Sequence, residues 1–221
     1  MGGRDPPQAE RGAVRMSETK RLSIFPLSGA LLFPGMHLPL HIFEDRYRAL
    51  INDAMARDRQ IGMIQPKSGG NRPALFDVGC VGKIIDIEAL DDGRFNVVLE
   101  GLARFRVVEE IDASTAFRQV RAEIEDDLEM DEVLASAERA ALEIESRKFA
   151  ELQGYQVDWD SIGRLDDMAF VNGIAQIAPF DAASKQALLE IDGLANRAEL
   201  IIQLLQFFGR QDGDDDRVTL Q

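Results

Sequence analysis

The chain is 221 residues long, with 45% apolar and 29% charged residues, which is ordinary for a globular protein and excludes disorder over its whole length. Lys and Arg number 25 against 39 Asp and Glu, a formal charge of −14 that argues against DNA, RNA or an anionic membrane as partner. Residues 1–67 carry +3 and the remainder −17, so a small basic patch in the N-terminal part stays open.

Cysteine usage and hydropathy indicate a cytoplasmic protein. Cys80 is the single cysteine, so no intrachain disulfide can form, which fits a reducing compartment. The apolar stretch from Ile24 to Leu40 is interrupted by three prolines and two glycines, whereas a spanning helix needs about 20 helix-compatible apolar residues. We therefore predict neither a signal peptide nor a membrane span.

Residues 1–19 contain Gly, Pro and charged residues with few apolar ones, which predicts a disordered leader. Met16 opens the sequence Met-Ser-Glu-Thr-Lys directly before the first apolar run. We hypothesise that translation starts at Met16 rather than at Met1, which the intact mass of the natively expressed protein would show.

Residues 20–125 read mainly as strands. Ser23–Pro26 and His37–Phe43 are short apolar segments that contain proline, which predicts sheet edges or strand ends. Ile61–Gln65 is a further short strand before a Gly-rich loop, Lys67–Asn71. Asp45–Arg57 is predicted to be a helix, because apolar residues recur at three- and four-residue spacing. That stripe consists of Tyr47, Leu50, Ile51, Ala54 and Met55.

A β-hairpin is the clearest local prediction. Asp91-Asp92-Gly93 is a turn sequence between Val81–Leu90 and an alternating run with Phe95, Val97 and Leu99 on one face. Arg104–Val108 and Phe117–Glu125 are predicted as two further strands. Such alternation indicates an antiparallel sheet or small barrel. The absence of βαβ alternation argues against a doubly wound nucleotide-binding fold.

After Asp131 the apolar spacing becomes helical. Asp181 is predicted to cap one helix, while Pro179, Gly193 and Gly209 are predicted to stop others. The sequence thus predicts a β-rich subdomain over 20–125, a linker in Glu125–Asp131, a helical bundle within 126–209 and an acidic disordered tail over 210–221. The predicted helices are Glu132–Leu152, Ser161–Ile177, Ala182–Ile191 and Leu194–Phe208.

No catalytic, cofactor or metal site is predicted. The segment Gly79–Lys83 lacks the length and the hydroxyl residue of a phosphate-binding loop. Adjacent Ser184 and Lys185 would point about 100° apart on a helix, so they do not form a catalytic dyad. His37, His41 and Glu44 could be read as a metal cluster, but no further ligand accompanies them, and partly buried polar residues at a strand end are the favoured interpretation. Cys80 is interpreted as a small buried apolar residue.

Several motifs, in order and at matching spacing, resemble the N-terminal substrate-binding domain of the Lon protease family from Leu22 to Phe208. They are Leu-Ser-Ile-Phe-Pro-Leu at 22–27, Leu-Phe-Pro-Gly at 32–35, Phe-Glu-Asp-Arg-Tyr at 43–47, Gly79 and Gly82, Gly-Leu-Ala-Arg at 101–104, Lys-Gln-Ala-Leu-Leu-Glu at 185–190, Arg197 and Leu204.

The resemblance implies an α+β fold: a PUA-like antiparallel β-rich N-terminal subdomain with one helix, followed by a C-terminal α-helical bundle. In full-length Lon an ATPase module and a Ser–Lys peptidase follow this domain, and neither is expected here. The expectation is a stand-alone bacterial protein that is not an enzyme and uses no cofactor.

We expect the motif residues to have mainly structural roles. The Phe33-Pro34-Gly35 segment is expected to shape a turn, and Phe43 to pack in the core. Glu44, Arg46 and Arg104 are expected to form hydrogen-bonded pairs that fix the helix on the sheet. Direct contact of these residues with a ligand is the alternative reading.

Two functional classes remain. The first is a non-enzymatic module that binds unfolded or degron-bearing polypeptides, including as an adaptor for a protease, through apolar surface between the subdomains. Phe33 and Met36, in an expected exposed turn, are its candidate contact residues. The second is an RNA-binding PUA-like protein, which the charge of −14 and the scarcity of Tyr and Trp oppose. The partner's identity and the oligomeric state stay open.

Overall fold

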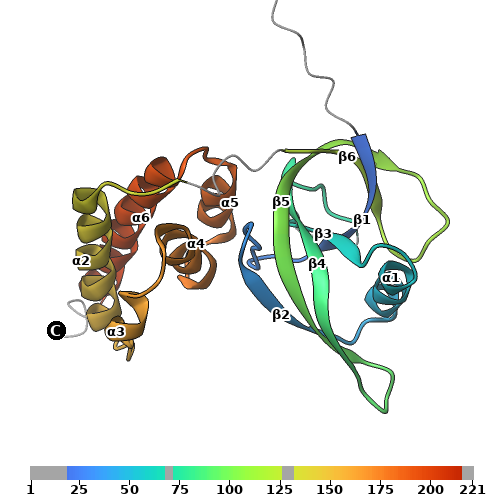
Figure 1. Ribbon diagram of the computed structural model, residues 1–221, viewed down its shortest axis with the longest axis horizontal. Helices are drawn as coiled ribbons and strands as arrows, with labels where there is room; N and C mark the ends of the chain where they lie inside the picture. The colour runs from blue at the N-terminus through green and yellow to red at the C-terminus, as the bar shows by residue number, and fades with distance from the viewer. Residues whose placement is uncertain (1–18, 68–71, 126–131, 216–221) are drawn as a thin grey trace, which may run out of the picture.

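A computed structural model describes residues 19–67, 72–125 and 132–215, with the side chains of 211–215 excepted. The strands and one helix form a barrel, and the remaining helices form a second lobe beside it (Figure 1). The predicted leader lies outside the described residues except for Thr19, which opens the first strand. Most of the predicted linker and Ser68–Asn71 also lie outside them.

Six strands form one sheet with the order β2-β5-β4-β3-β1-β6. Because β6 also pairs with β5, the strands β1, β3, β4, β5 and β6 close into a barrel, and β2 extends it along the first half of β5. The strands are β1 Thr19–Pro26, β2 His37–Ile42, β3 Gln60–Ile64, β4 Val78–Ala89, β5 Phe95–Ile111 and β6 Gln119–Ile124.

The sheet is antiparallel except between β1 and β3, where Ile24 lies opposite Gly62 in a parallel pair. The sequence predicts an antiparallel sheet or small barrel, and the β1–β3 pair departs from that pattern. The cause is the intervening helix α1, Asp45–Met55, because a crossover connection brings the chain back in the same direction. The helix itself begins where the apolar spacing predicts it.

The β4–β5 hairpin is confirmed, with Gly93 at φ 79° in its turn. The separate strand predicted at Arg104–Val108 is wrong, because β5 runs through Gly101 without interruption. Gly101 pairs with Gly82 in the ladder. Its missing side chain leaves room for the preceding turn, since a Cβ at Gly101 would lie 2.0 Å from the carbonyl oxygen of Phe33.

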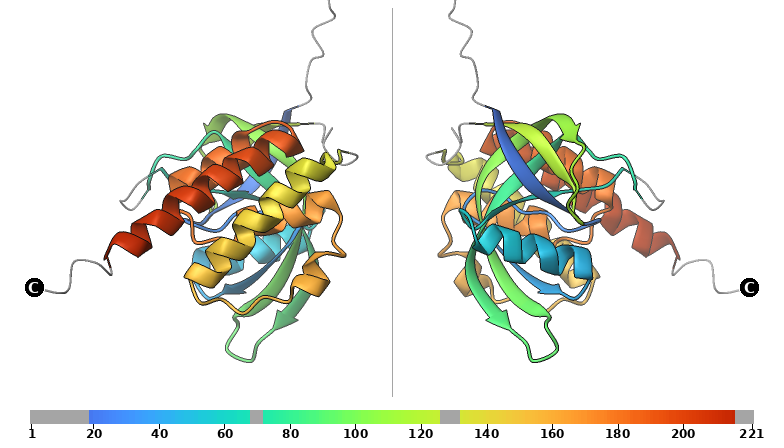
Figure 2. Two further views of the ribbon diagram at one scale, coloured as in Figure 1. Left: turned by 90° about the vertical axis from the view of Figure 1, so that its left-hand side faces the viewer. Right: turned by 90° about the vertical axis from the view of Figure 1, so that its right-hand side faces the viewer.

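Two apolar clusters fill the β lobe. In one, the fully buried ring of Phe105 occupies the space that Gly62 and Gly79 leave open. In the other, Leu50 and Ile51 of α1 pack on the strands, and α1 lies across one side of the barrel (Figure 2). Leu99 of the predicted hairpin face is fully buried here, while Phe95 is half-buried.

Five helices form the second lobe, with α2 and α6 packed along each other (Figure 2). The predicted helix Ser161–Ile177 is divided, because the Asp166 side chain accepts a hydrogen bond from the Ala169 N–H and begins a new helix. Asp181 caps α5 in the same way, as predicted. The helices are α2 Ser136–Leu152, α3 Trp159–Ile162, α4 Asp167–Ile177, α5 Ala182–Glu190 and α6 Leu194–Asp215.

The predicted stop at Gly209 is wrong, because α6 continues to Asp215. A glycine inside a helix costs only about 1 kcal/mol, so it does not end one by itself. At Gly209 the helix α6 faces α2, and a Cβ there would lie 3.4 Å from Leu152 Cδ1, an ordinary contact.

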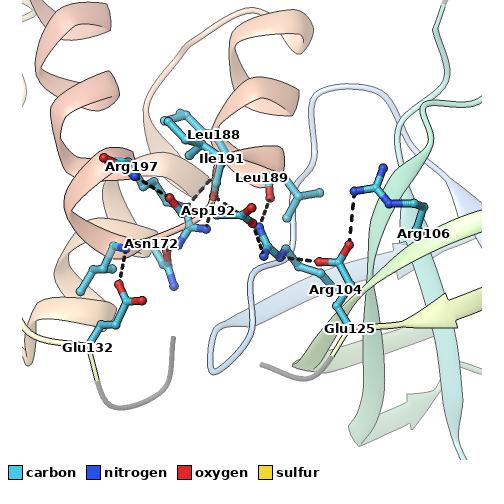
Figure 3. A network of polar contacts seen from close by, with 12 residues as sticks. Arg104, Arg106, Glu125, Glu132, Asn172, Leu188, Leu189, Ile191, Asp192 and Arg197 are labelled. Carbon is cyan, nitrogen blue, oxygen red and sulfur yellow. Dashed lines mark hydrogen bonds and ion pairs between the residues drawn. The ribbon is translucent and has the colours of Figure 1, made fainter. Parts of the chain in front are cut away.

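Arginines from both lobes bind the C-terminal end of α5 (Figure 3). Arg104 of β5 donates to the carbonyls of Leu189 and Ile191 at 3.2 and 3.3 Å and pairs with Asp192 at 2.7 Å. Arg197 of α6 donates to the carbonyls of Leu188 and Ile191 at 2.9 and 3.1 Å. Cations at this position complement the helix dipole. Arg104 thus joins α5 to the barrel rather than fixing α1 on the sheet.

Further buried polar groups cross between the lobes. The Nζ of Lys185 donates to the carbonyls of Gly29 and Gln176 at 3.1 and 3.2 Å, and burial lowers the pKa of Lys185. Gln65, directly after β3, donates to Gln186 of α5 at 3.1 Å. These bonds fix the orientation of the helical lobe on the barrel.

Candidate functional site

An open apolar groove lies within the helical lobe and has a volume of about 240 Å³. We call it the helical groove. Its floor includes the buried rings of Phe149 and Phe170. Its walls include Tyr155, Val157, Trp159, Leu165, Ile174 and Ile177.

The turn after α2 builds one wall. Gly154 adopts φ 69°, a left-handed conformation that glycine takes without strain, and the Tyr155 N–H donates to the Ala150 carbonyl at 2.8 Å. This arrangement reverses the chain and brings Tyr155 to the groove. The Gln153-Gly154 pair, which ends the apolar periodicity of α2, is the sequence signal for this turn.

A helix cap at Asp158 positions Trp159 at the start of α3. Asp158 accepts hydrogen bonds from the N–H and hydroxyl of Ser161 at 3.1 and 2.6 Å, which begins α3. These bonds lower the pKa of Asp158. Trp159 then lies under the guanidinium of Arg147, 4.5 Å from its ring centroid, in a cation–π contact. Neither Arg147 nor Trp159 is among the contact residues predicted from the sequence.

The mouth of the groove exposes apolar side chains. Ile177 is 79% exposed, Tyr155 51% and Leu165 43%. Exposed apolar residues that line a common hollow are typical of an interaction surface. Around them, residues 132–210 carry seven basic and thirteen acidic side chains, a formal charge of −6. The helical groove is therefore an apolar surface in an acidic setting.

Asp167, in the first turn of α4, binds Leu134, just before α2, and Arg139 of α2. It thereby fixes the two helices that form walls of the groove. Its carboxylate accepts from the Leu134 N–H at 2.8 Å and pairs with Arg139. Burial by itself would raise the pKa of Asp167, but the hydrogen bonds from Arg139 and Leu134 outweigh it and lower the pKa.

We expect Asp167→Asn to reduce the free energy of unfolding at pH 7 by about 1.5–3 kcal/mol, the size of a charge-assisted hydrogen bond. A folded pKa below the ordinary value of about 3.9 means that the carboxylate stabilises the fold at neutral pH. That stabilisation is lost as the pH falls through the folded pKa, so the two proteins converge in acid. Urea unfolding at pH 7 and below pH 3 measures this. Asp166→Asn is the control, because Asn caps helices as well as Asp. An equal loss at both pH values would contradict the assignment.

The two candidate contact residues lie elsewhere. Phe33 is fully buried against Arg197, whose guanidinium is 5.2 Å from the ring centroid, so its predicted exposure is wrong. The helical lobe covers this turn, which the local sequence does not reveal. Met36 is half-buried and packs against the same cluster. The expected contact surface between the subdomains is occupied by this packing, and the helical groove lies in the helical lobe alone.

The other candidate residues are not brought together. His41 Nδ1 lies 2.7 Å from Asn96 Oδ1, and His41 Nε2 lies 3.2 Å from Arg94 Nη1. Within the described ranges no group of three His, Cys, Asp or Glu side chains could hold a metal ion. Cys80 is buried, and the Ser184 N–H donates to the Asp181 carboxylate. Glu44 pairs with Arg46 at 2.8 Å, and Phe43, expected in the core, is 61% exposed.

Of the helices the structure describes, none has both the length and the apolar character needed to cross a bilayer.

Comparison with known proteins identifies a matching family and related sequences. The family of the ATP-dependent protease La (LON) substrate-binding domain matches residues 21–206. Lon protease 2 of Myxococcus xanthus is 31% identical over 200 residues, covering 83% of this chain and 23% of that protein. The Lon protease of Xanthomonas oryzae pv. oryzae is 32% identical over 213 residues, covering 90% of this chain and 24% of that protein. The chain thus spans about a quarter of the length of these relatives.

Solved structures show the same fold. The Lon N-terminal domain protein from Xanthomonas campestris superposes with a TM-score of 0.63 at 22% identity, covering 85% of this chain and 98% of that one. The N-terminal domain of Mycobacterium avium complex Lon protease gives a TM-score of 0.61 at 20% identity with the same coverage. These likenesses confirm the α+β architecture expected from the sequence.

Proposed function

The chain belongs to the Lon substrate-binding domain family, and on that premise we propose that it binds unfolded or degron-bearing polypeptides through the helical groove. The observation that carries the proposal is the exposed apolar mouth of the groove, with Ile177 79% exposed above a floor of buried aromatic rings. An unfolded chain exposes the apolar side chains that such a surface would remove from water.

The character of the groove supports a polypeptide as its ligand. Its walls are almost entirely apolar, with few polar groups to orient a small polar molecule. The acidic setting disfavours a phosphate backbone, so RNA is not supported as a ligand of this surface. A segment that combines apolar and basic side chains would complement both the groove and its surroundings.

We further propose that the protein is not an enzyme and acts in the cytoplasm, as an adaptor that presents bound polypeptides to a protease. The buried Cys80 is compatible with a reducing compartment. The adaptor step is tested separately: purified protein added to a reconstituted protease should speed degradation of an unfolded substrate. An unchanged degradation rate at saturating protein would contradict the adaptor role without affecting the binding proposal.

The groove is tested with Ile177→Glu. An apolar ligand that covers this position would bury the new carboxylate without a partner. Binding of a fluorescein-labelled, permanently unfolded model protein should therefore weaken by about tenfold or more. Because Ile177 is 79% exposed, the substitution should leave the melting temperature nearly unchanged. Fluorescence anisotropy measures the affinity at low and high salt.

Val133→Glu is the matched control, since Val133 is 80% exposed in the same lobe and does not line the groove. It should bind like the parent protein, and added salt should weaken binding only slightly. Equal affinity of the two variants would refute the groove as the contact surface. Tight, salt-sensitive binding of single-stranded RNA without polypeptide binding would refute the function.

A further inference from the structure

A second hollow, of about 400 Å³, is lined by residues of α1, of the β3–β4 connection and of the loop that joins β5 to β6. The helix α1 and the β5–β6 loop lie on the side of the barrel away from the helical lobe (Figure 1). We call it the arginine pocket. Three arginines from three separate segments line it: Arg46 on α1, Arg72 in the β3–β4 connection and Arg118 just before β6. Three arginines around one hollow are unexpected in a protein of formal charge −14.

One carboxylate orients two of these arginines. Glu110 accepts from Arg118 Nε and Nη2 at 2.9 and 2.7 Å and from Arg72 Nη2 at 2.6 Å. Arg118 Nη1 donates to the Pro73 carbonyl at 2.8 Å. These bonds, mainly those from Arg118, lower the pKa of Glu110 to about 2, so Glu110 stays ionised at neutral pH. Glu110 does not itself line the pocket.

The guanidinium groups keep capacity for another acceptor. Arg118 makes the three hydrogen bonds just given, whereas a guanidinium has five N–H donors. Arg72 and Arg46 have side chains that are 64% and 49% exposed, and Arg46 stacks over the Tyr47 ring at 4.5 Å. Arg46 also pairs with Glu44 at 2.8 Å. Glu110, Glu44 and the Tyr47 ring thus hold the guanidinium planes, and the N–H donors that these partners leave over suit a planar oxyanion.

Apart from Thr115, the other lining residues are mainly apolar. Pro26, Pro66, Pro73, Ile111 and Phe117 line the pocket beside the Tyr47 ring. Burial raises the pKa of Tyr47, and its hydroxyl donates to the Pro26 carbonyl at 3.3 Å. Tyr47 therefore presents an apolar ring and no negative charge. The pocket combines cationic donors at one part with apolar surface at another, so it suits an anionic group attached to an apolar body.

We propose that the arginine pocket binds the C-terminal carboxylate of a polypeptide whose last residue is apolar. Arginines would receive the carboxylate, and the prolines, Ile111 and Phe117 would contact the last side chain. A chain terminus brings one negative charge, whereas a nucleic acid brings one per nucleotide and is repelled by the charge of −14. The site is distinct from the helical groove and would add selection by chain end to selection by apolar content.

The test uses two fluorescein-labelled peptides with the same Gly- and Ser-rich body ending in Leu, one with a free carboxylate and one amidated. The free acid should bind about tenfold more tightly by anisotropy, because the amide cannot form the charge-assisted bonds. In Arg46→Gln combined with Arg72→Gln, the two peptides should bind alike. Both positions are exposed enough for the variant to fold, which its melting temperature checks.

The matched control is Arg121→Gln, which removes a 54% exposed, ion-paired arginine of the same lobe that does not line the pocket. It should keep the preference for the free acid. Equal binding of acid and amide to the parent protein overturns the proposal. Displacement of the free-acid peptide by millimolar inorganic phosphate would also overturn the proposal. The same holds if single-stranded RNA, and not the peptide, binds in a way that depends on the arginines. Ile177→Glu should leave the acid preference intact, so failure of the groove and failure of the pocket are separable.

Discussion

Arg197→Ala should cost about 3–5 kcal/mol in the free energy of unfolding, the largest effect we expect of a side-chain truncation. Arg197 is 1% exposed and donates to two carbonyls at the end of α5 and to Asn172 at 3.1 Å (Figure 3). Its removal leaves these acceptors buried without that donor and opens a cavity beside Phe33. Urea unfolding followed by circular dichroism measures the loss.

Arg164→Ala is the control, because Arg164 is an exposed arginine of the same lobe and should change stability by less than about 0.5 kcal/mol. Arg197→Lys should recover only part of the loss, since an ammonium keeps the charge but not the forked geometry. If Arg197→Ala unfolds at the same urea concentration as Arg164→Ala, the buried guanidinium does not stabilise the helical lobe.

Gly101→Ala should destabilise the protein by about 3 kcal/mol, although it adds a single methyl group. The new Cβ would lie 2.0 Å from the Phe33 carbonyl oxygen, which is backbone and cannot rotate away. The turn must therefore move off β5, and Phe33 must leave its packing in the helical lobe. Thermal unfolding measures the loss, and the exposure of Trp159 fluorescence to a quencher reports loosening of that lobe.

Gly163→Ala provides the matched control, because its added Cβ would lie 3.4 Å from the nearest atom, an ordinary contact. It should melt within about a degree of the parent protein. A Gly101→Ala protein that melts equally well would show that the close approach of the turn to β5 is not required for folding.

Local features were predictable from the sequence because their determinants are neighbours in the chain. The helix α1 follows from the spacing of its apolar residues, the β4–β5 turn from Asp92 and Gly93, and the start of α5 from Asp181. Each depends on contacts within a few residues. The start of α4 had the same kind of signal in Asp166, which a longer apolar stripe obscured.

Long-range packing was not predictable from local pattern. The local sequence around Phe33 predicts a turn residue, but Phe33 is buried because residues far along the chain, Arg197 and the apolar cluster of the helical lobe, pack against it. The parallel β1–β3 pair depends on the path of α1, which periodicity does not give. The helical groove and the arginine pocket each collect residues from separate segments, so no contiguous motif marks either of them.

The pairing of β1 with both β3 and β6 has a consequence for synthesis of the chain. The first strand finds its last neighbour only when Gln119–Ile124 has left the ribosome, so the barrel cannot close while earlier residues are emerging. Contacts of such large sequence separation slow folding and prolong the exposure of unpaired strand edges. We propose that this domain binds unfolded chains. During its own translation it is itself incompletely folded for an extended time.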